Sequence, residues 1–330
     1  METRRWTNSP YLQLSMTMVL WGSAFSSSKA VVEHVPHSVG AFLRFGGAAV
    51  ALLLAVRLFG GRGTRVPARS ARRAAGAGVL GVFAYNGFFF WGLSLAPSLD
   101  AGILIPVMSP VLTSAFLLVT GKERAGWART AGLALGLLGA VVFFLGAGGG
   151  AQGGSSRLWG DALFLVSAVC WASYTLVGPR VLSGVEPLRA TTYATCAGAL
   201  LLGVLAAPDL AEVRWSEVPS GVWLNSVYLA VGAAAVANLF YYRGVASVGP
   251  ANASLMMFSV PVVNTLCATF FLGESFGRLQ GAGALILLAG AALAVTQGRL
   301  PGRRAASARP RASTAAATAG RSGPRGEAAG

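Results

Sequence analysis

The chain contains two copies of one segment, the second displaced from the first by 150 to 152 residues. Each copy holds five long apolar stretches. Because five is odd, a chain that crosses a membrane at every stretch enters the second copy from the opposite side, so the two copies are inverted. Inverted repeats of this kind are typical of membrane transporters. The residue pairs that reveal the duplication are Trp21 and Trp171, Ser23 and Ser173, Asn86 and Asn238, Gly92 and Gly244, Pro110 and Pro261, Glu123 and Glu274, Gly132 and Gly283, and Gly139 and Gly290.

The composition agrees with a chain that lies in a membrane. Hydrophobic residues make up 54% of the sequence and charged residues only 11%, against about 25% charged residues in a typical soluble domain. Each apolar stretch has about 20 residues, enough for an α-helix to span a hydrocarbon core of about 30 Å. The sequence therefore predicts an all-α integral membrane protein whose ten transmembrane helices form two inverted five-helix repeats. The predicted spans are 12–32, 38–58, 74–96, 99–119, 126–146, 159–178, 188–207, 220–242, 251–272 and 278–297.

The spans divide the chain into five regions. They are an N-terminus (1–10), a first repeat (11–146), a Gly-rich outer linker (147–158), a second repeat (159–297) and a basic tail (298–330). The tail is rich in Arg, Pro, Ser, Ala and Gly without apolar periodicity, so we expect it to be disordered.

The formal net charge of +15 is distributed unevenly along the chain. The N-terminus, the tail and the even-numbered connections share one side of the membrane and hold most of the 26 Lys and Arg residues, whereas the opposite connections hold Arg157, Arg214 and Arg278. The positive-inside rule then places both termini in the cytoplasm, with the protein in the plasma or inner membrane. Since no surface of alternating aromatic and basic residues accompanies the charge, nucleic acid is not an expected partner.

Two short motifs and the repeat spacing support a family resemblance. The motif Trp21–Ser23 followed by Lys29, the motif Leu43–Phe45, and the repeated spacing from Pro to Glu to Gly occur in that order. Together they resemble the EamA-type transporters of the drug/metabolite transporter superfamily over residues 11–297. The resemblance implies two inverted five-helix bundles around a central path, lined by spans 1, 3, 4, 6, 8 and 9, that exports amino acids, metabolites or toxic compounds. The expected partners are a small-molecule substrate and the lipid bilayer.

Aromatic residues in the middle of repeated spans are the first candidates for a substrate cavity. Trp21 and Trp171 lie about ten residues inside their spans, although Trp is usually enriched at membrane interfaces. Tyr174, one turn after Trp171, extends the second aromatic wall. The alternative is that these rings only fill space between helices.

Three amides are the second group of cavity candidates: Asn86, Asn238 and, more weakly, Asn264. An amide in hydrocarbon needs hydrogen-bond partners, which a substrate, a water-filled cavity or a neighbouring helix supplies equally well. Aromatic residues flank Asn86 and Asn238, which suits an amphipathic ligand.

Lys29 and Arg44 are cations within the spans, and neither is duplicated, because the corresponding residues are Pro179 and Ala194. They could attract a carboxylate outward. Alternatively, their long side chains reach the outer headgroups, or Arg44 pairs with backbone carbonyls.

Proline and glycine suggest where helices bend or pack closely. Pro110 and Pro261 each remove a backbone hydrogen bond, and they are either hinges beside the cavity or static kinks. Small residues in spans 5 and 10 allow close packing, so these spans are expected to form a scaffold or the contact of a homodimer.

The acidic residues of the repeats stand at span ends or in loops. We therefore expect no proton relay built on a buried carboxylate, and we interpret Glu123 and Glu274 as helix caps or loop anchors. No metal or cofactor is expected, since Pro36 interrupts the short cluster of Glu33, His34 and His37. The span-end residues are Glu33, Asp100, Glu123, Asp161 and Glu274.

The first hypothesis is thus a secondary, non-ATP transporter that exports a small metabolite, amino acid or drug-like compound by alternating access between the repeats. An exchanger for phosphorylated anions is the alternative within transport, although it would need more cations than Lys29 and Arg44. A scaffold or receptor without transport is the alternative outside it. An enzyme is not expected, because the spans hold no mid-span His, paired carboxylates or Ser with a base.

Overall fold

The computed structural model describes residues 9–59, 66–120, 126–148, 154–181, 186–248, 256–275 and 277–296. All of them belong to one compact unit, Met1–Gly298. The predicted disordered tail, most of the cytoplasmic N-terminus, part of the Gly-rich linker and Glu123 lie outside the described residues.

The first repeat contributes five helical rods, and the third of them is interrupted by a π-helical segment, η1. Its elements are α2 (Pro10–Val32), α3 (His37–Phe59), α4 (Ala68–Gly78), η1 (Val79–Ala84), α5 (Tyr85–Leu95), α6 (Ser98–Val119) and α7 (Trp127–Gly148).

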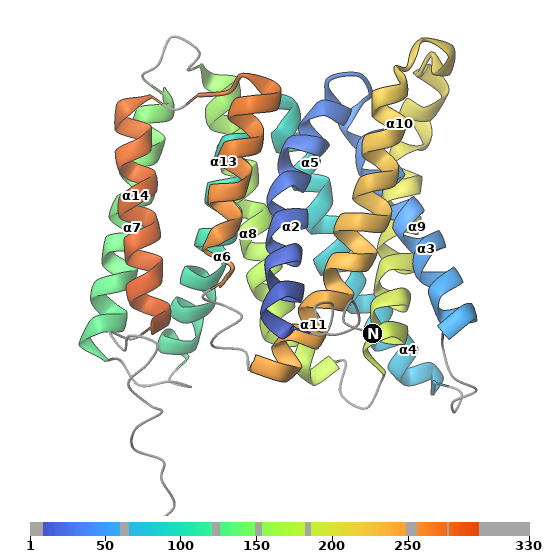
Figure 1. Ribbon diagram of the computed structural model, residues 1–330, viewed down its shortest axis with the longest axis horizontal. Helices are drawn as coiled ribbons and strands as arrows, with labels where there is room; N and C mark the ends of the chain where they lie inside the picture. Colours follow the sequence, from blue (N-terminus) through green and yellow to red (C-terminus); the bar gives the residue numbers. More distant parts are fainter. Residues whose placement is uncertain are drawn as a thin grey trace, which may run out of the picture. The chain divides into compact units, whose positions relative to one another are not determined.

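The second repeat follows the same order and also has a π-helical segment, η3, in its third rod. Its elements are α8 (Ser155–Val181), α9 (Pro187–Glu212), the short 3-10 turn η2 (Trp215–Glu217), α10 (Ser220–Val227), η3 (Tyr228–Val236), α11 (Ala237–Val248), α13 (Ser259–Leu272) and α14 (Arg278–Thr296). Because the first repeat has five rods, α8 runs in the opposite direction to α2 (Figure 1).

The described helices confirm the predicted all-α membrane fold, and their ends differ from the predicted spans by a few residues. The ninth rod differs most, since α13 begins at Ser259 and residues 251–255 lie outside the described part. Within the described ranges, six helices are long and apolar enough to cross a membrane, and three shorter apolar helices accompany them. Large apolar side chains such as Phe271, 81% exposed, face outward, as lipid contact requires.

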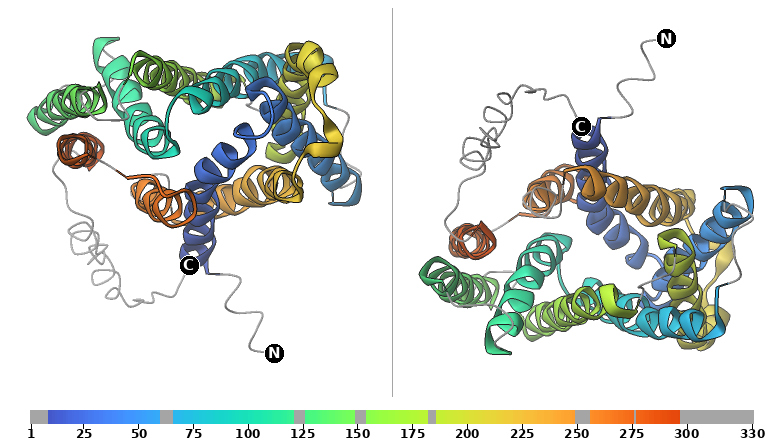
Figure 2. Two further views of the ribbon diagram at one scale, coloured as in Figure 1. Left: turned by 90° about the horizontal axis from the view of Figure 1, so that it is seen from above. Right: turned by 90° about the horizontal axis from the view of Figure 1, so that it is seen from below.

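The two repeats are interleaved and do not form two separate bundles. The first helix of each repeat packs against the third and fourth rods of the other, α2 against α11 and α13, and α8 against α5 and α6. Figure 2 shows α2 between α13 and α11. The second helices, α3 and α9, pack together, as do the fifth, α7 and α14. The two five-helix repeats are thus joined by packing between their first, third and fourth rods.

Glycines allow α7 and α14 to approach with backbone against backbone. A Cβ added to Gly139 would lie 2.3 Å from the Leu287 nitrogen, and one added to Gly283 would lie 2.3 Å from the Phe143 nitrogen. Neither residue could carry a side chain without moving a helix. These glycines of spans 5 and 10 therefore form a contact between two helices of the same chain. A homodimer stays a prediction, and these glycines do not support it.

Candidate substrate-binding site

Arg44 of α3 stands among side chains from both repeats. Its Nη1 donates a hydrogen bond to the Ser28 hydroxyl at 3.3 Å. Its Cζ lies 5.2 Å from the centre of the Phe45 ring and 5.8 Å from that of Phe89. Its charge also acts on Tyr85 of the first repeat and on Tyr228 of the second. These residues form the group that we call the Arg44 cluster.

Arg44 lacks a counter-ion in the described part of the chain. None of the salt bridges there involves it, and its buried Nε has no hydrogen-bond partner. Cation–π contacts contribute about 0.5 to 2 kcal/mol, whereas removing an ion from water costs several kcal/mol. An anion that entered between these helices would find an unpaired donor.

The predicted cavity residues Trp171 and Tyr174 lie next to the Arg44 cluster. The Tyr85 ring is 5.2 Å from the Trp171 ring and 6.0 Å from the Phe89 ring, and the Trp171 and Tyr174 rings are 5.9 Å apart. The structure thus brings together two aromatic candidates from α8 and one of the two predicted cations.

Trp21 occupies the corresponding position on α2 but makes different contacts. Its Nε1 donates to the Ala233 carbonyl in η3 at 3.2 Å, and its ring lies 4.9 Å from the Tyr241 ring. On the same helix, the hydroxyls of Ser23 and Tyr228 share a hydrogen bond of 2.6 Å. Helix α2 reaches Arg44 directly through Ser28, and through Ser23 it also bonds Tyr228, on which the Arg44 charge acts.

Asn86 and Asn238 have one local role in both repeats, and the sequence did not indicate it. Asn86 Nδ2 donates to the Val82 carbonyl at 2.8 Å, and Asn238 Nδ2 donates to the Ala234 carbonyl at 2.5 Å. Each accepting carbonyl belongs to the π-helical segment that precedes the Asn. A π-helix contains an extra residue relative to an α-helix and therefore leaves a carbonyl without its usual donor. These bonds lie within one helix, although Asn86 Oδ1 is buried without a partner.

A second repeated pair of hydrogen bonds joins the π-helical rods to the opposite repeat. The Thr17 hydroxyl donates to the Ala237 carbonyl at 3.2 Å, and the Ser167 hydroxyl donates to the Tyr85 carbonyl at 3.1 Å. Thr17 and Ser167 are equivalent in the duplication, as are Tyr85 and Ala237. Both carbonyls directly follow a π-helical segment. Only the repetition of a hydroxyl residue could have drawn attention to them in the sequence.

Lys29 and Asn264 do not join the Arg44 cluster. Lys29 Nζ donates to the carbonyls of Leu93 and Ala96 at 2.8 and 3.2 Å, where α5 ends. A cation at this position interacts favourably with the helix dipole. Asn264 Nδ2 donates to the Ser98 carbonyl at 3.0 Å, and its Oδ1 accepts from Ser26 at 3.3 Å. Both residues therefore link helices.

Pro110 and Pro261 differ in position despite their repetition. Pro110 lies inside α6, and the neighbouring Ser109 hydroxyl donates to the Ile105 carbonyl at 2.6 Å. Pro261 lies in the first turn of α13, which begins at Ser259. A backbone N–H has no intrahelical acceptor there, so a lost hydrogen bond no longer argues for a hinge at Pro261.

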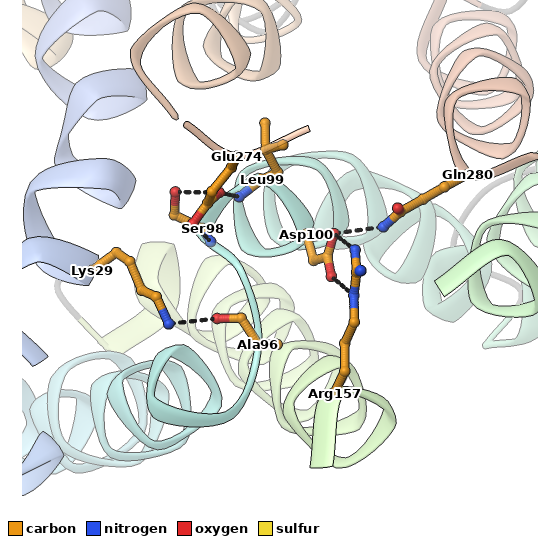
Figure 3. A network of polar contacts seen from close by, with 8 residues as sticks. All are labelled: Lys29, Ala96, Ser98, Leu99, Asp100, Arg157, Glu274 and Gln280. Carbon is orange, nitrogen blue, oxygen red and sulfur yellow. Dashed lines mark hydrogen bonds and ion pairs between the residues drawn. The ribbon is translucent and has the colours of Figure 1, made fainter. Parts of the chain in front are cut away.

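A network of polar contacts joins the two repeats where α5 passes into α6 (Figure 3). Asp100 accepts hydrogen bonds from Arg157 Nε at 2.8 Å, Arg157 Nη2 at 3.0 Å and Gln280 Nε2 at 2.6 Å. Glu274 accepts from the backbone N–H groups of Ser98 and Leu99 at 2.9 and 2.8 Å. Glu274 is thus confirmed as a helix cap, and the helix that it caps, α6, belongs to the other repeat.

Burial changes the interpretation of two acidic residues. Asp100 and Asp161 stand at span ends, as predicted, yet both are 0% exposed. The expectation that no proton relay uses a buried carboxylate was based on these span-end positions. The position at a span end does not expose Asp100 or Asp161 to solvent.

Comparison with known proteins agrees with this architecture. The model of a family described as the EamA-like transporter family matches residues 8–145 and 158–296. A solved structure, described only as a protein, has a TM-score of 0.60 and 24% sequence identity, covering 88% of this chain and 99% of its own. At that identity the likeness concerns the fold.

Two curated relatives are similar over almost their whole length. YyaM of Bacillus subtilis, named an uncharacterized transporter, is 27% identical over 297 residues, covering 88% of this chain and 95% of its own. A protein of Streptantibioticus cattleyicolor, named a probable terminal-alkyne amino-acid exporter, is 30% identical over 297 residues, covering 89% of this chain and 95% of its own.

Proposed function

The chain belongs to the EamA-like transporter family, and from this premise we propose that it is a secondary exporter of small compounds that carry a carboxylate, amino acids among them. The observation that carries the proposal is Arg44, whose Nε is buried without a partner between side chains of both repeats. A carboxylate matches the planar, forked donors of a guanidinium. The name of the Streptantibioticus relative, an amino-acid exporter, points to the same substrate class.

The rings around Arg44 suit the rest of such a substrate. Tyr85 and Phe89 stack at 6.0 Å, and Trp171 adjoins Tyr85. Aromatic faces bind apolar groups well and leave one edge for a polar contact. We therefore favour an amphipathic amino acid over a highly charged metabolite. A phosphorylated anion would need further cations, and the amine of Lys29 is bonded to the end of α5.

Alternating access in this fold requires groups of helices drawn from both repeats. Because α2 packs on α11 and α13, and α8 packs on α5 and α6, a movement of one complete repeat against the other would separate most of these contacts at once. We propose that α7 with α14 stays together, since glycines place their backbones in contact. The π-helical segments η1 and η3 are candidate points of change, because such segments occur often at functional sites.

The uneven distribution of Lys and Arg supports a location in the plasma or inner membrane with both termini in the cytoplasm. In that orientation the contacts of Asp100 and Glu274 lie on the extracellular side of the helices. They would hold the substrate path closed on that side in the conformation described.

Flux measurements in proteoliposomes test the proposal. Purified protein is reconstituted, and efflux is compared for aromatic and aliphatic amino acids and for the amine that each becomes without its carboxylate. We expect saturable efflux of at least one amino acid and none of its amine partner. Competition by phosphorylated metabolites would favour the anion exchanger, and the absence of saturable flux for every compound, from folded protein, would favour the scaffold.

Substitution of Arg44 makes the test specific. In Arg44→Gln we expect the apparent KM for the carboxylate substrate to rise about 10- to 100-fold, because hydrogen bonds to a charged group contribute about 1.5 to 3 kcal/mol. Arg57→Gln is the matched control, since Arg57 lies in the last turn of the same helix and is exposed. Equal KM values in the two variants would contradict the assignment of Arg44.

A further inference from the structure

Asp161 of α8 lies one turn after Arg157, whose guanidinium bonds Asp100 of α6, and α8 packs against α6. Asp161 and Asp100 are therefore electrostatic neighbours. Asp100 receives three hydrogen bonds, from Arg157 and Gln280. Among the described residues, neither oxygen of Asp161 has a hydrogen-bond partner, and Asp161 is 0% exposed. Two carboxylates cannot bond each other unless one of them carries a proton, because neither has a donor.

The charges around this pair do not balance. If both are ionised, Asp100 and Asp161 carry two negative charges, while Arg157, which is ion-paired with Asp100, supplies one positive charge. Glu274 is also near Arg157 but is bonded to the start of α6, and Lys29 is bonded to the end of α5. Two adjacent buried carboxylates with one counter-ion do not both stay ionised.

A proton corrects this imbalance better than a metal ion would. Hard cations such as Ca²⁺ take six or more oxygen ligands, and the described residues contain no group of three or more His, Cys, Asp or Glu able to hold a metal. A proton on Asp161 removes one negative charge and creates an O–H donor toward Asp100. We propose that Asp161 and Asp100 together bind one proton, and that this proton is exchanged for substrate, a role that rests on the proposed transport function.

The position of the pair connects the proton to the transport path. Asp100 belongs to α6 and its partners Arg157 and Gln280 belong to α8 and α14, so the contacts span both repeats (Figure 3). Helix α8 also carries Trp171, ten residues after Asp161 and therefore about 15 Å along the helix axis. Loss of the proton places two negative charges side by side and favours the separation of α6 from α8. The outer end would then open.

Infrared spectroscopy of the substrate-free protein tests the proton site without any transport. At neutral pH we expect a carboxylic-acid C=O band in the wild type that disappears in Asp161→Asn. Glu217→Gln is the control, because Glu217 is an exposed carboxylate in the turn after α9. Absence of the band from the folded wild type would overturn the proposal and leave the substrate assignment unaffected.

Vesicle flux tests the coupling. With the vesicle interior acidic by one pH unit, exchange of one proton per substrate supports up to about a tenfold accumulation, since one unit is a factor of ten in proton concentration. In Asp161→Asn we expect this accumulation to fall to the level seen without a gradient. Exchange of labelled for unlabelled substrate should continue, because the amide has the shape of the protonated acid; such exchange also shows that the variant is folded.

Two further outcomes would overturn the coupling. Wild-type flux that is indifferent to the pH gradient would show that the proton is not exchanged for substrate, and accumulation driven by a sodium gradient would identify another coupling ion. An absence of all flux in the wild type would instead contradict the proposed function, whereas the infrared result would still stand.

Discussion

Arg157 and Arg44 both place a guanidinium between packed helices, but the two guanidinium groups have different partners. Arg157 donates two hydrogen bonds to Asp100, at 2.8 and 3.0 Å. Arg44 has a serine hydroxyl at 3.3 Å and two aromatic faces. A bidentate ion pair between α8 and α6 holds helices together, whereas an arginine without a carboxylate is ready for an anion from outside the protein. The same type of side chain thus links two helices at Arg157 and is available to bind a ligand at Arg44.

The largest expected effect comes from removing the partner of Asp100. Arg157→Ala leaves a buried carboxylate uncompensated beside Asp161, and we expect the free energy of unfolding to fall by about 3 to 5 kcal/mol. Thermal unfolding in detergent measures this loss. The exposed pair of Arg214 and Glu217, at 3.4 Å, is the control, because Arg214→Ala should change little. Similar losses in both variants would remove the distinction between the two pairs.

Stability measured with and without substrate tests whether Arg44 binds a ligand, in contrast to Arg157, which links helices. A transported carboxylate at 100 times its Kd should stabilise the wild type by about 2.7 kcal/mol, since a ligand that binds only the folded state shifts the unfolding equilibrium. In Arg44→Met we expect this ligand-dependent stabilisation to be mostly lost. The variant without ligand should be as stable as the wild type or more stable, because an unpaired charge has been removed. A large loss of stability without ligand would instead make Arg44 structural.

A smaller effect is expected at the π-helical segments. Asn86→Ala and Asn238→Ala each remove a hydrogen bond to a carbonyl of the preceding π-helical turn, at 2.8 and 2.5 Å. Each substitution should lower the free energy of unfolding by about 1 kcal/mol, by similar amounts in the two repeats. If one variant loses transport but keeps its stability, that result would support the predicted role of the substituted Asn in the substrate cavity.

The smallest effect is expected at Lys29. Lys29→Met removes a cation from the carbonyls that end α5, and such contacts contribute about 0.3 to 1 kcal/mol. Chemical denaturation in detergent measures the change. If the variant keeps full stability while the KM for a carboxylate rises, Lys29 belongs to the substrate path, as one of the two interpretations of the sequence had it.

Much of the architecture could be predicted from the sequence, because it depends on properties that repeat along the chain. The duplication and the length of the apolar stretches indicated ten helices in two inverted repeats, and the family resemblance is confirmed by the matching family. Glu274 was also interpreted correctly as a cap, but the sequence did not show that the helix it caps is α6 of the other repeat. The predicted cavity residues remain predictions, although Trp171 and Tyr174 do lie beside Arg44 through Tyr85.

The features that sequence reasoning missed depend on contacts between distant residues. Asp100 looked like a span-end carboxylate, but its partner Gln280 is 180 positions away. The π-helical segments consist of apolar residues, as an α-helical span does, so the sequence indicated neither these segments nor the bonds that Asn86 and Asn238 make to their carbonyls. Glycines of spans 5 and 10 indicated close packing without revealing that α7 and α14 are each other's partner.

The sequence by itself determined the number, the length and the alternating direction of the helices, because hydrophobic length and an odd repeat are properties of the chain read in order. The tertiary structure decided that α2 and α8 each pack against helices of the opposite repeat and that Asp100 is paired with the Arg157 guanidinium. It also decided that, among the described residues, Arg44 has no ion-pair partner and the Asp161 oxygens have no hydrogen-bond partner. Those outcomes depend on which side chains meet across the interleaved repeats, and no local pattern encodes the pairing of residues that lie far apart along the chain.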